Sequence, residues 1–499
     1  MCGIFGIYGK SQIPVEDYLQ LLTHRGPDHQ ETRLLHHVTF GHTRLAIVDV
    51  EHGQQPLQSP DGRYTLICNG EIYNHETIRQ QFPEYHFQTD SDSEAILALY
   101  HHYGVQAVER LDGMFSFALY DSETDKLLLA RDPLGIKPLY YGWHDDTLYF
   151  GSEIKSLHRI VDELHEFPPG HTYHDGIFVQ YYDLKTLPTT QAGSDTPTLS
   201  EIRECLTRAV QKRLMSDVPL GVYLSGGLDS TIVAALVKQA KPDVHSFAVG
   251  VEGSVDIENA RLAADIIGTT HHEYLYTVEE IREALPEIIY YLESFDPSLV
   301  RSAIPNYFLA RMTREYVTVV LTGEGADELY AGYHYLKQFD ELQLHNELIE
   351  LTASLYNCNL QRCDRMTMAH SIEARVPFLD NEFVAMSMRV PRSDKIHPST
   401  QTEKWALREA FSDILPAHVT WRKKEQFSQG AGSNHMLEAL AEGQFSDDDY
   451  LTQVSAIERR SGLKITSKEM LMYYIEFQRV FSEKASSLVR LWRGETMDG

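Results

Sequence analysis

Short apolar strands alternate with helices in the second half of this 499-residue chain, and two of the strands run directly into a glycine-rich loop. The first apolar run, 221–224, precedes Ser225-Gly226-Gly227-Leu228-Asp229-Ser230. The second, 317–321, precedes Thr322-Gly323-Glu324-Gly325-Ala326-Asp327-Glu328. The alternation predicts an α/β fold with a doubly wound parallel sheet. Ligands of such sheets bind beyond the carboxyl ends of strands, so we expect one site at the two loops.

The first loop has the features of a polyphosphate site. Its adjacent glycines let the backbone approach phosphate oxygens, its serines add hydroxyl donors, and the helix that follows directs amide groups toward the anion. A carboxylate would repel phosphate, so we expect Asp229 to hold Mg²⁺, with Asp327 as the second ligand. The loop is not the Gly-x4-Gly-Lys-Ser/Thr pattern, so transfer of a γ-phosphate is not expected. A loop that grips the two terminal phosphates of a nucleotide as one unit favours attack at the α-phosphorus, with pyrophosphate leaving.

The N-terminal end combines a reactive residue with strand-rich sequence. Removal of Met1 would give Cys2 a free α-amine, whose pKa of about 7.7–8.0 makes it an available base near neutral pH. Such an amine can activate its own side-chain nucleophile. A helix is expected over 93–100, and strands are expected at 65–68, 113–120, 126–130 and 139–143. The mixture predicts sheets in contact, with helices outside.

Charge and cysteine content exclude several classes of partner. The chain has 44 basic and 72 acidic side chains and a formal charge of −28, which repels nucleic acid and anionic membranes. No apolar run approaches the ~20 residues of a membrane helix, and no secretory signal is visible. Five scattered cysteines favour a reducing cytoplasm over a disulfide framework. We therefore expect a cytoplasmic protein that acts on small molecules; the sequence leaves a homodimer open.

A stretch rich in Thr, Ser, Pro and Gly divides the chain. Residues 184–200 have no periodicity and are the expected linker. The predicted domains are 1–183 and 201–499, and the second is expected to be mostly helical beyond about residue 340.

The motifs along residues 1–476 resemble those of glutamine-hydrolysing asparagine synthetases of the bacterial B type. Besides the two glycine loops, they are Met1-Cys2-Gly3-Ile4-Phe5-Gly6, His24-Arg25-Gly26-Pro27-Asp28, Asn69-Gly70-Glu71-Ile72-Tyr73-Asn74, Gly135-Ile136-Lys137-Pro138-Leu139-Tyr140 and Glu373-Ala374-Arg375-Val376-Pro377-Phe378-Leu379-Asp380. The resemblance implies an α+β N-terminal-nucleophile glutaminase domain (an αββα sandwich), an α/β ATP-pyrophosphatase domain, and an internal ammonia tunnel between them.

For the glutaminase site, the resemblance implies that Cys2 attacks the glutamine amide to give a thioester and ammonia. Arg44 can form paired bonds to the substrate α-carboxylate, and Asp92 can pair with its α-ammonium. Donors at Asn69 and Gly70 can bind the oxyanion of the tetrahedral intermediate. The remaining residues expected around glutamine complete the 44–48 segment and the turn at 69–71: Leu45, Ala46, Ile47, Val48 and Glu71.

For the synthetase site, the resemblance implies ATP contacts at Leu224, Val249, Thr322 and Gly323. Glu324 matches a glutamate that is important for forming the acyl-adenylate. Lys424 matches a lysine at the phosphates, and Lys404 could do similar work. Arg301 resembles a basic residue near the acidic substrate. Two positions depart from the bacterial pattern, because Thr322 and Ala326 stand where those relatives carry Ser.

The implied reaction is synthesis of L-asparagine from aspartate, ATP and glutamine-derived ammonia, through a β-aspartyl-AMP intermediate and with release of AMP and pyrophosphate. An amidotransferase of the same scaffold that acts on another carboxylic acid stays open as an alternative. A regulatory protein without turnover would have lost residues such as Cys2, Asp229 or Glu324, and all three are present. A phosphoribosyl or sugar amidotransferase would share only the N-terminal half, and the Ser225 loop argues against it.

Overall fold

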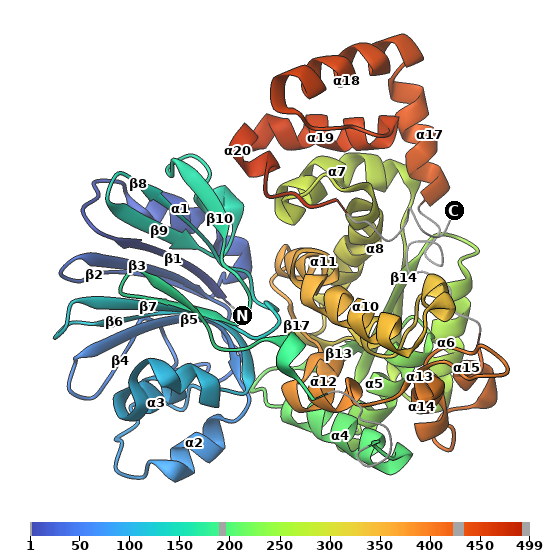
Figure 1. Ribbon diagram of the computed structural model, residues 1–499, viewed down its shortest axis with the longest axis horizontal. Coiled ribbons are helices and arrows are strands. Elements are labelled where there is room, and N and C mark those ends of the chain that lie inside the picture. The colour runs from blue at the N-terminus through green and yellow to red at the C-terminus, as the bar shows by residue number, and fades with distance from the viewer. Residues whose placement is uncertain (1, 189–195, 423–433, 492–499) are drawn as a thin grey trace.

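The computed structural model describes residues 2–188, 196–422 and 434–491, and its first half holds two six-stranded antiparallel sheets (Figure 1). The first sheet has the order β10-β8-β9-β1-β3-β2, from β1 (Cys2–Tyr8), β2 (His29–Leu34), β3 (Val38–Arg44), β8 (Tyr140–His144), β9 (Thr147–Gly151) and β10 (Glu163–Glu166). The second has the order β12-β11-β7-β6-β5-β4, from β4 (Leu57–Gln58), β5 (Tyr64–Ile72), β6 (Gly113–Asp121), β7 (Lys126–Arg131), β11 (His171–His174) and β12 (Ile177–Gln180).

The two sheets lie face to face between helices. Helix α1 (Val15–Gln20) contacts β1 and β3, while α3 (Glu94–Tyr103) contacts β5 and α2 (His75–Gln81). Successive side chains of a strand point to opposite faces. Accordingly Ile67 of β5 belongs to the apolar cluster between the sheets, and its neighbour Leu66 belongs to the cluster under α3. The expected αββα sandwich is confirmed.

A third sheet, parallel and five-stranded, organises the second half. Its order is β15-β14-β13-β16-β17, from β13 (Leu220–Tyr223), β14 (His245–Gly250), β15 (Thr270–Leu275), β16 (Val319–Leu321) and β17 (Glu373–Arg375). Val222 belongs to the apolar cluster on one face of this sheet, and the next residue, Tyr223, belongs to the apolar cluster on the other face. Both faces are therefore covered, and the predicted doubly wound sheet is confirmed.

Strand order reverses at the centre of this sheet. From β13 the chain continues outward to β14 and β15, and later returns to β16 on the opposite side of β13. Such a switch point opens a crevice beyond the carboxyl ends of the two strands. The loops that follow β13 and β16 are the two glycine loops of the sequence, so the topology places them side by side.

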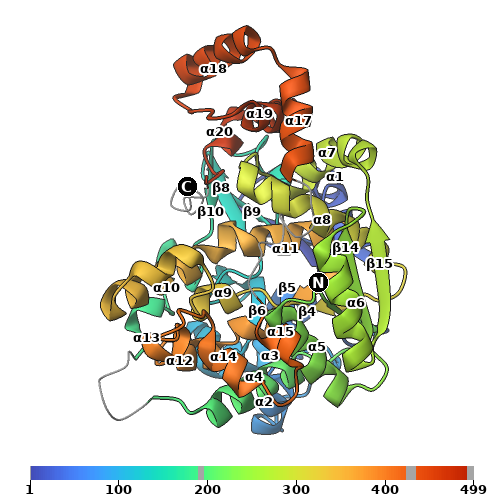
Figure 2. The same ribbon diagram turned by 90° about the vertical axis from the view of Figure 1, so that its right-hand side faces the viewer.

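Helices surround this sheet and form a separate layer at one end of the molecule (Figures 1 and 2). Around the sheet lie α4 (Leu199–Lys212), α5 (Leu228–Ala240), α6 (Val255–Ile267), α7 (Val278–Leu292), α8 (Pro297–Thr313), α9 (Ala326–Leu329), α10 (Glu341–Ser354), α11 (Asn359–Met368), α12 (Asn381–Ser387), α13 (Arg392–Lys395), α14 (Trp405–Ala410) and α15 (Ala417–Thr420). The end layer consists of α17 (Asn434–Gln444), α18 (Asp447–Ser461), α19 (Lys468–Val480) and α20 (Glu483–Ser486).

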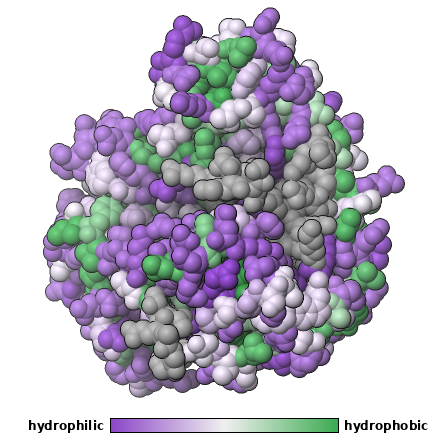
Figure 3. Space-filling model, turned by 45° about the vertical axis from the view of Figure 1, so that its right-hand side comes forward, coloured by the Kyte–Doolittle hydropathy of each residue, from purple (hydrophilic) through white to green (hydrophobic). Residues whose placement is uncertain are grey.

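Short 3₁₀ turns complete the secondary structure: η1 (Thr23–Arg25), η2 (Gly104–Arg110), η3 (Ile154–Ser156), η4 (Leu184–Thr186), η5 (His334–Gln338), η6 (Leu355–Asn357) and η7 (Pro377–Leu379). The face in Figure 3 is mostly hydrophilic, with small scattered apolar areas. Among the described residues, no helix has both the length and the apolarity that crossing a membrane requires. The middle of the predicted linker, 189–195, lies outside the described residues.

Candidate active site

Cys2 begins β1, and three other segments meet it there. Strand pairing places Arg44 of β3 opposite it. The backbone nitrogen of Cys2 donates to Asn69 Oδ1 at 3.1 Å, and Arg25 Nε donates to the Cys2 carbonyl at 3.0 Å. The residue is only 6% exposed. The fold thus brings together Cys2, the 44–48 segment and Asn69, as the sequence predicts.

Burial raises the pKa of the Cys2 thiol, although the N-terminal charge, the Leu45 amide and the Arg44 charge oppose this effect. A thiol in this setting is mostly protonated and needs a base before it can attack. Because the Leu45 amide is one of the groups that lower this pKa, the segment after β3 acts on the nucleophile through its backbone.

Asn69, Gly70 and Glu71 lie within β5 and not in the turn that the sequence suggested. A Cβ at Gly70 would lie 2.1 Å from the Met114 carbonyl oxygen, so only glycine permits this approach of β5 to β6. Asn69 Nδ2 is buried without a hydrogen-bond partner among the described residues. A buried donor of this kind needs an acceptor, which a substrate oxygen could supply.

The two residues expected to hold the ends of glutamine have protein partners here. The Arg44 guanidinium donates to the carbonyl oxygens of Val48, Asp49 and Val50 at 3.2, 2.5 and 2.9 Å, and so shapes the loop that follows β3. Asp92 Oδ2 accepts from the Ile72 backbone nitrogen at 2.6 Å, next to the end of β5. Burial raises the pKa of Asp92, and the Ile72 bond opposes that rise.

The second site is a cavity of about 300 Å³ at the switch point of the parallel sheet. This volume is at the small end of the range for small-molecule sites. Nine predicted nucleotide and metal residues line it, together with Glu324: Leu224, Ser225, Gly227, Asp229, Ser230, Val249, Thr322, Gly323 and Asp327. Gly226 lies in the same loop without lining the cavity, and Lys424 lies outside the described residues.

The Ser225 loop is closed by its own hydroxyl groups. Ser225 Oγ and Ser230 Oγ lie 3.1 Å apart, and the Ser225 amide donates to Ser230 Oγ at 3.2 Å. Gly226 has φ +69° and a Cβ there would lie 2.4 Å from the Asn259 backbone, so this position requires glycine. Helix α5 begins directly after Gly227, and no side chain caps its N-terminus. The first residues of this helix line the cavity, and the amide groups at a helix N-terminus can bind an anion.

One lysine joins the two predicted metal ligands. Lys404 Nζ lies 2.5 Å from Asp229 Oδ2 and 2.5 Å from Asp327 Oδ1. Because both carboxylates contact one ammonium group, they lie close enough to share one cation. Asp327 belongs to the first turn of α9, a helix that begins immediately after Gly325. Paired carboxylates of this kind, completed by phosphate oxygens, fit Mg²⁺.

Glu324 is paired with Arg362 of α11 across the same cavity. Burial raises the pKa of Glu324; Arg362 opposes the rise, while Asp327 and Asp229 add to it. Next to it, burial raises the pKa of Glu328 to about 7, and this side chain accepts from Tyr333 Oη at 2.5 Å. Burial thus favours the neutral form of Glu324 in the cavity and of Glu328 beside it.

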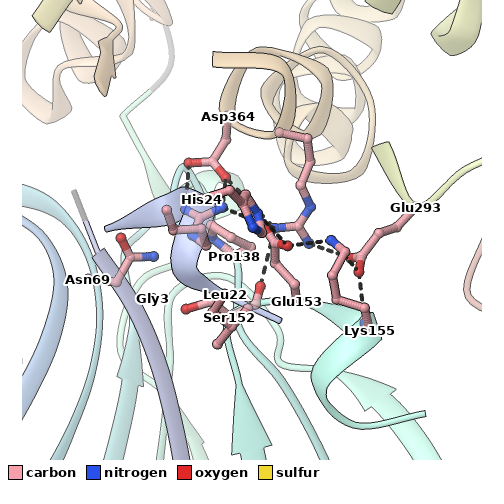
Figure 4. A network of polar contacts seen from close by, with 12 residues as sticks. Gly3, Leu22, His24, Asn69, Pro138, Ser152, Glu153, Lys155, Glu293 and Asp364 are labelled. Carbon is pink, nitrogen blue, oxygen red and sulfur yellow. Dashed lines mark hydrogen bonds and ion pairs between the residues drawn. The ribbon is translucent and has the colours of Figure 1, made fainter. Parts of the chain in front are cut away.

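A buried network of charged side chains joins the two halves of the chain (Figure 4). Arg25 donates to Glu153 Oε1 at 2.7 Å and to Asp364 Oδ2 at 2.8 Å. The network continues through Arg365, which lies 3.2 Å from Glu153 and 2.9 Å from Glu293. Asp364 and Arg365 follow Arg362 on α11, so one helix contacts both sites.

Sequence reasoning missed Arg362 and Asp364, because no local motif marks either residue. The motif that contains Glu373 and Arg375 also gives no indication of what these two side chains contact. Arg375 donates to Glu373 Oε1 at 2.6 Å and lies 3.5 Å from Glu71 Oε2, between the two sites. Arg301, expected near the acidic substrate, is paired with Glu469 of the end layer at 2.5 Å and does not line the cavity.

Both halves of the chain match known protein families. Residues 1–172 match the family described as "Glutamine amidotransferase domain", and residues 201–350 and 340–492 match "Asparagine synthase". A probable glutamine-hydrolysing asparagine synthetase of Schizosaccharomyces pombe is 38% identical over 99% of this chain and 96% of its own length. Asparagine synthetase B of Escherichia coli is 38% identical over 96% of this chain and 91% of its own length. The chain belongs to the family of glutamine-hydrolysing asparagine synthetases.

Proposed function

We propose that this protein makes L-asparagine from L-aspartate and ATP, with glutamine as the nitrogen donor. The observation that carries the proposal is the presence of two separate sites in one chain: a buried thiol beside Asn69, and a cavity built from the Ser225 loop and Glu324. The β-carboxylate of aspartate attacks the α-phosphorus of ATP, which gives β-aspartyl-AMP and pyrophosphate. Ammonia then displaces AMP, and asparagine is formed.

In the first site, the Cys2 sulfur attacks the amide carbon of glutamine, and the α-amine exposed by removal of Met1 takes the thiol proton. That proton passes to the leaving nitrogen as the C–N bond breaks, so ammonia and a thioester form, and water then releases glutamate. Asn69 and Gly70 bind the oxyanion, and the buried Nδ2 of Asn69 supports this role. Asp92 would bind the substrate α-ammonium.

Arg44 would bind the substrate α-carboxylate by exchanging backbone carbonyl oxygens for a charged acceptor. Its present partners are the carbonyls of the loop that follows β3. A bond between a guanidinium and a carboxylate is stronger than one to a neutral carbonyl, so the exchange is favourable. The loop over 45–50 would then close on bound glutamine.

In the second site, the Ser225 loop and the N-terminus of α5 hold the phosphates, and Glu324 assists formation of the adenylate. Lys424 and Lys404 offset the charge that builds on departing pyrophosphate. Asp229 and Asp327 would hold Mg²⁺, which when bound neutralises phosphate charge. Thr322 retains a hydroxyl, which accepts from the Glu324 amide at 3.4 Å, while Ala326 is fully buried among apolar side chains.

The same proposal includes the division of the chain and its setting. The domains are 1–183 and 201–499 with a linker at 184–200, although Leu184–Thr186 form η4 and Leu199 begins α4. We propose a cytoplasmic enzyme that needs Mg²⁺ and has no nucleic-acid or membrane partner. A homodimer is compatible with these features.

The decisive experiment measures ATP-dependent pyrophosphate release across a panel of carboxylic acids, with and without glutamine. Aspartate should stimulate release, and AMP should be the spent nucleotide. If another acid stimulates release and aspartate does not, the alternative amidotransferase is correct. ADP as the product would exclude adenylation altogether.

The variant Cys2→Ala tests the separation of the two chemistries. It should lose glutamine-dependent synthesis and keep synthesis from ammonium salts, because the cavity lies in the other half of the chain. Asparagine formed from each nitrogen source is measured by chromatography. A variant that is also inactive with ammonium would show that Cys2 is needed for more than glutamine cleavage.

A further inference from the structure

Lys404 occupies the position of a cation between two carboxylates. Its Nζ is 2.5 Å from Asp229 Oδ2 and 2.5 Å from Asp327 Oδ1, and the lysine is only 4% exposed. The two acids come from the first turns of α5 and α9, and the lysine comes from a third segment, immediately before α14. Three separate parts of the chain therefore converge on this one ion-pair cluster.

The backbone conformation at Lys404 is unusual, and it places the ammonium group between Asp229 and Asp327. Lys404 has φ 55° and ψ 30°, a left-handed conformation that is unfavourable for a residue with a side chain. Its amide donates to the Tyr330 carbonyl at 3.2 Å. Strain of this kind persists where the surrounding structure fixes it, most often at functional sites.

Gly332 leaves the space in which Lys404 and Asp327 meet. A Cβ at this position would lie 1.8 Å from Asp327 Oδ1 and 2.6 Å from Lys404 Cε. No larger residue fits there unless the ion pair moves. The neighbouring Glu403 is fixed separately, because Arg408 donates to it at 2.6 Å and Lys337 lies 3.2 Å away.

The ammonium group and a metal ion cannot share this position. Two carboxylates that face one buried point need a positive charge between them, and the ammonium group now supplies it. If Asp229 and Asp327 hold Mg²⁺ when the nucleotide binds, Lys404 must leave. The nearest negative charge that the nucleotide brings is its phosphate chain, at the adjacent Ser225 loop.

We propose that Lys404 is the resident counter-cation of the metal site, and that binding of magnesium and nucleotide exchanges its ammonium group for the metal. This inference rests on the proposed function. Without nucleotide, Lys404 stabilises the two carboxylates and keeps free metal out. With nucleotide, the displaced ammonium group moves to the phosphates, so the lysine serves the site in both states.

The test measures metal binding to the full-length protein without nucleotide or turnover. Lys404→Met should bind Mn²⁺ on the order of tenfold more tightly than the wild type in spin-resonance titrations, because the metal no longer competes with a fixed charge. Its melting temperature without metal should be lower than that of the wild type. Added Mg²⁺ should raise it, and should have little effect on the wild type.

Two control variants make the result specific. Lys337→Met removes a nearby lysine that pairs with Glu403, and its metal binding should match the wild type. The double variant Asp229→Asn/Lys404→Met should lose the gain in Mn²⁺ affinity. Lys404→Gln, which keeps a hydrogen-bond donor between the carboxylates, replaces Lys404→Met if the latter does not fold, with the same results expected. Glutamine hydrolysis in the other half of the chain reports folding.

The exchange is overturned if neither Lys404 variant binds Mn²⁺ more tightly than the wild type, because Lys404 would then be only a structural ion-pair partner. Equal gains in Lys337→Met would also overturn it. Failure of the proposed function is distinguishable, since it would appear as missing asparagine and leave the metal titrations unchanged.

Discussion

Glu324 is paired with Arg362, and the guanidinium acts on the charge of this carboxyl group. Burial of Glu324 favours its neutral form and raises its pKa, and the nearby Asp327 and Asp229 act in the same direction. Arg362 is the group that opposes this shift. The charge of Glu324 matters in this cavity, because a further carboxylate there would repel both an acidic substrate and the phosphates of ATP.

Replacement of Arg362 by Met should therefore move the pH dependence of adenylation. Without the guanidinium, the pKa of Glu324 rises further. If the carboxylate form is active, the acid limb of the pH profile for pyrophosphate release moves to higher pH. The rate at neutral pH should fall on the order of ten- to a hundredfold. Glutamine hydrolysis by the same variant is the control and should keep its pH profile; an unshifted acid limb would contradict the assignment.

Secondary-structure elements with apolar runs are predictable from this sequence. The expected strands at 113–120 and 126–130 correspond to β6 (Gly113–Asp121) and β7 (Lys126–Arg131). Strand β17 is different, because two of its three residues are the buried charges Glu373 and Arg375. No hydrophobic periodicity marks such a strand, and its ion pairs become visible only in three dimensions.

The site shows the same limit. The Ser225 and Thr322 loops could be placed together because each follows an apolar strand of one parallel sheet. Arg362 could not be placed, since it reaches Glu324 from a helix 38 residues away in sequence. Local sequence patterns do not predict contacts that depend on how helices pack, whereas they do predict contacts that follow from strand order.

At the level of the strand pair, Gly70→Ala tests the close approach of β5 and β6. Its Cβ would lie 2.1 Å from the Met114 carbonyl oxygen, so the strands must separate or the backbone at Asn69 must shift. Unfolding free energy should fall by about 1–3 kcal/mol, as for other overpacked positions. Glutamine hydrolysis should fall more than tenfold, and ammonium-dependent synthesis should remain.

Gly443→Ala in α17 is the matched control for this prediction. An added Cβ there meets nothing within 4 Å, so stability should be unchanged or rise by up to about 1 kcal/mol. The unfolding free energies of both variants are measured by denaturant unfolding. Equal stability of Gly70→Ala and the wild type would show that β5 accommodates the methyl group.

Across the whole molecule, the two halves are joined by buried ion pairs as well as by the chain. Burial alone would raise the pKa values of Glu153 and Asp364. Instead, His24, Lys155 and Arg365 lower that of Glu153, and Arg25 and Lys137 lower that of Asp364. The folded state therefore binds fewer protons than the unfolded state at these groups, and their contribution to stability is present above their ordinary pKa values.

Stability should accordingly fall as the pH drops below about 4, where the same carboxylates in the unfolded chain take up protons. Asp364→Asn, which removes one partner of Arg25, should lower the unfolding free energy by about 3–5 kcal/mol at neutral pH. It should also flatten the pH dependence on the acid side. Scanning calorimetry from pH 3 to 7 measures both effects.

Asp413→Asn is the matched control, because this exposed carboxylate pairs with Arg203 at the surface. Such pairs contribute about 0–1 kcal/mol, so little change is expected. If Asp364→Asn behaves in the same way, the buried network does not join the halves energetically.

Helix α11 turns this network into a mechanical link. Arg362 contacts the adenylation centre, and two positions later Asp364 contacts Arg25, which also holds the carbonyl of the nucleophile. Both contacts are short, so a small displacement of the helix axis disturbs them together. A compound that binds in the cavity and displaces α11 would thereby also inhibit the release of ammonia at Cys2, in the other half of the molecule.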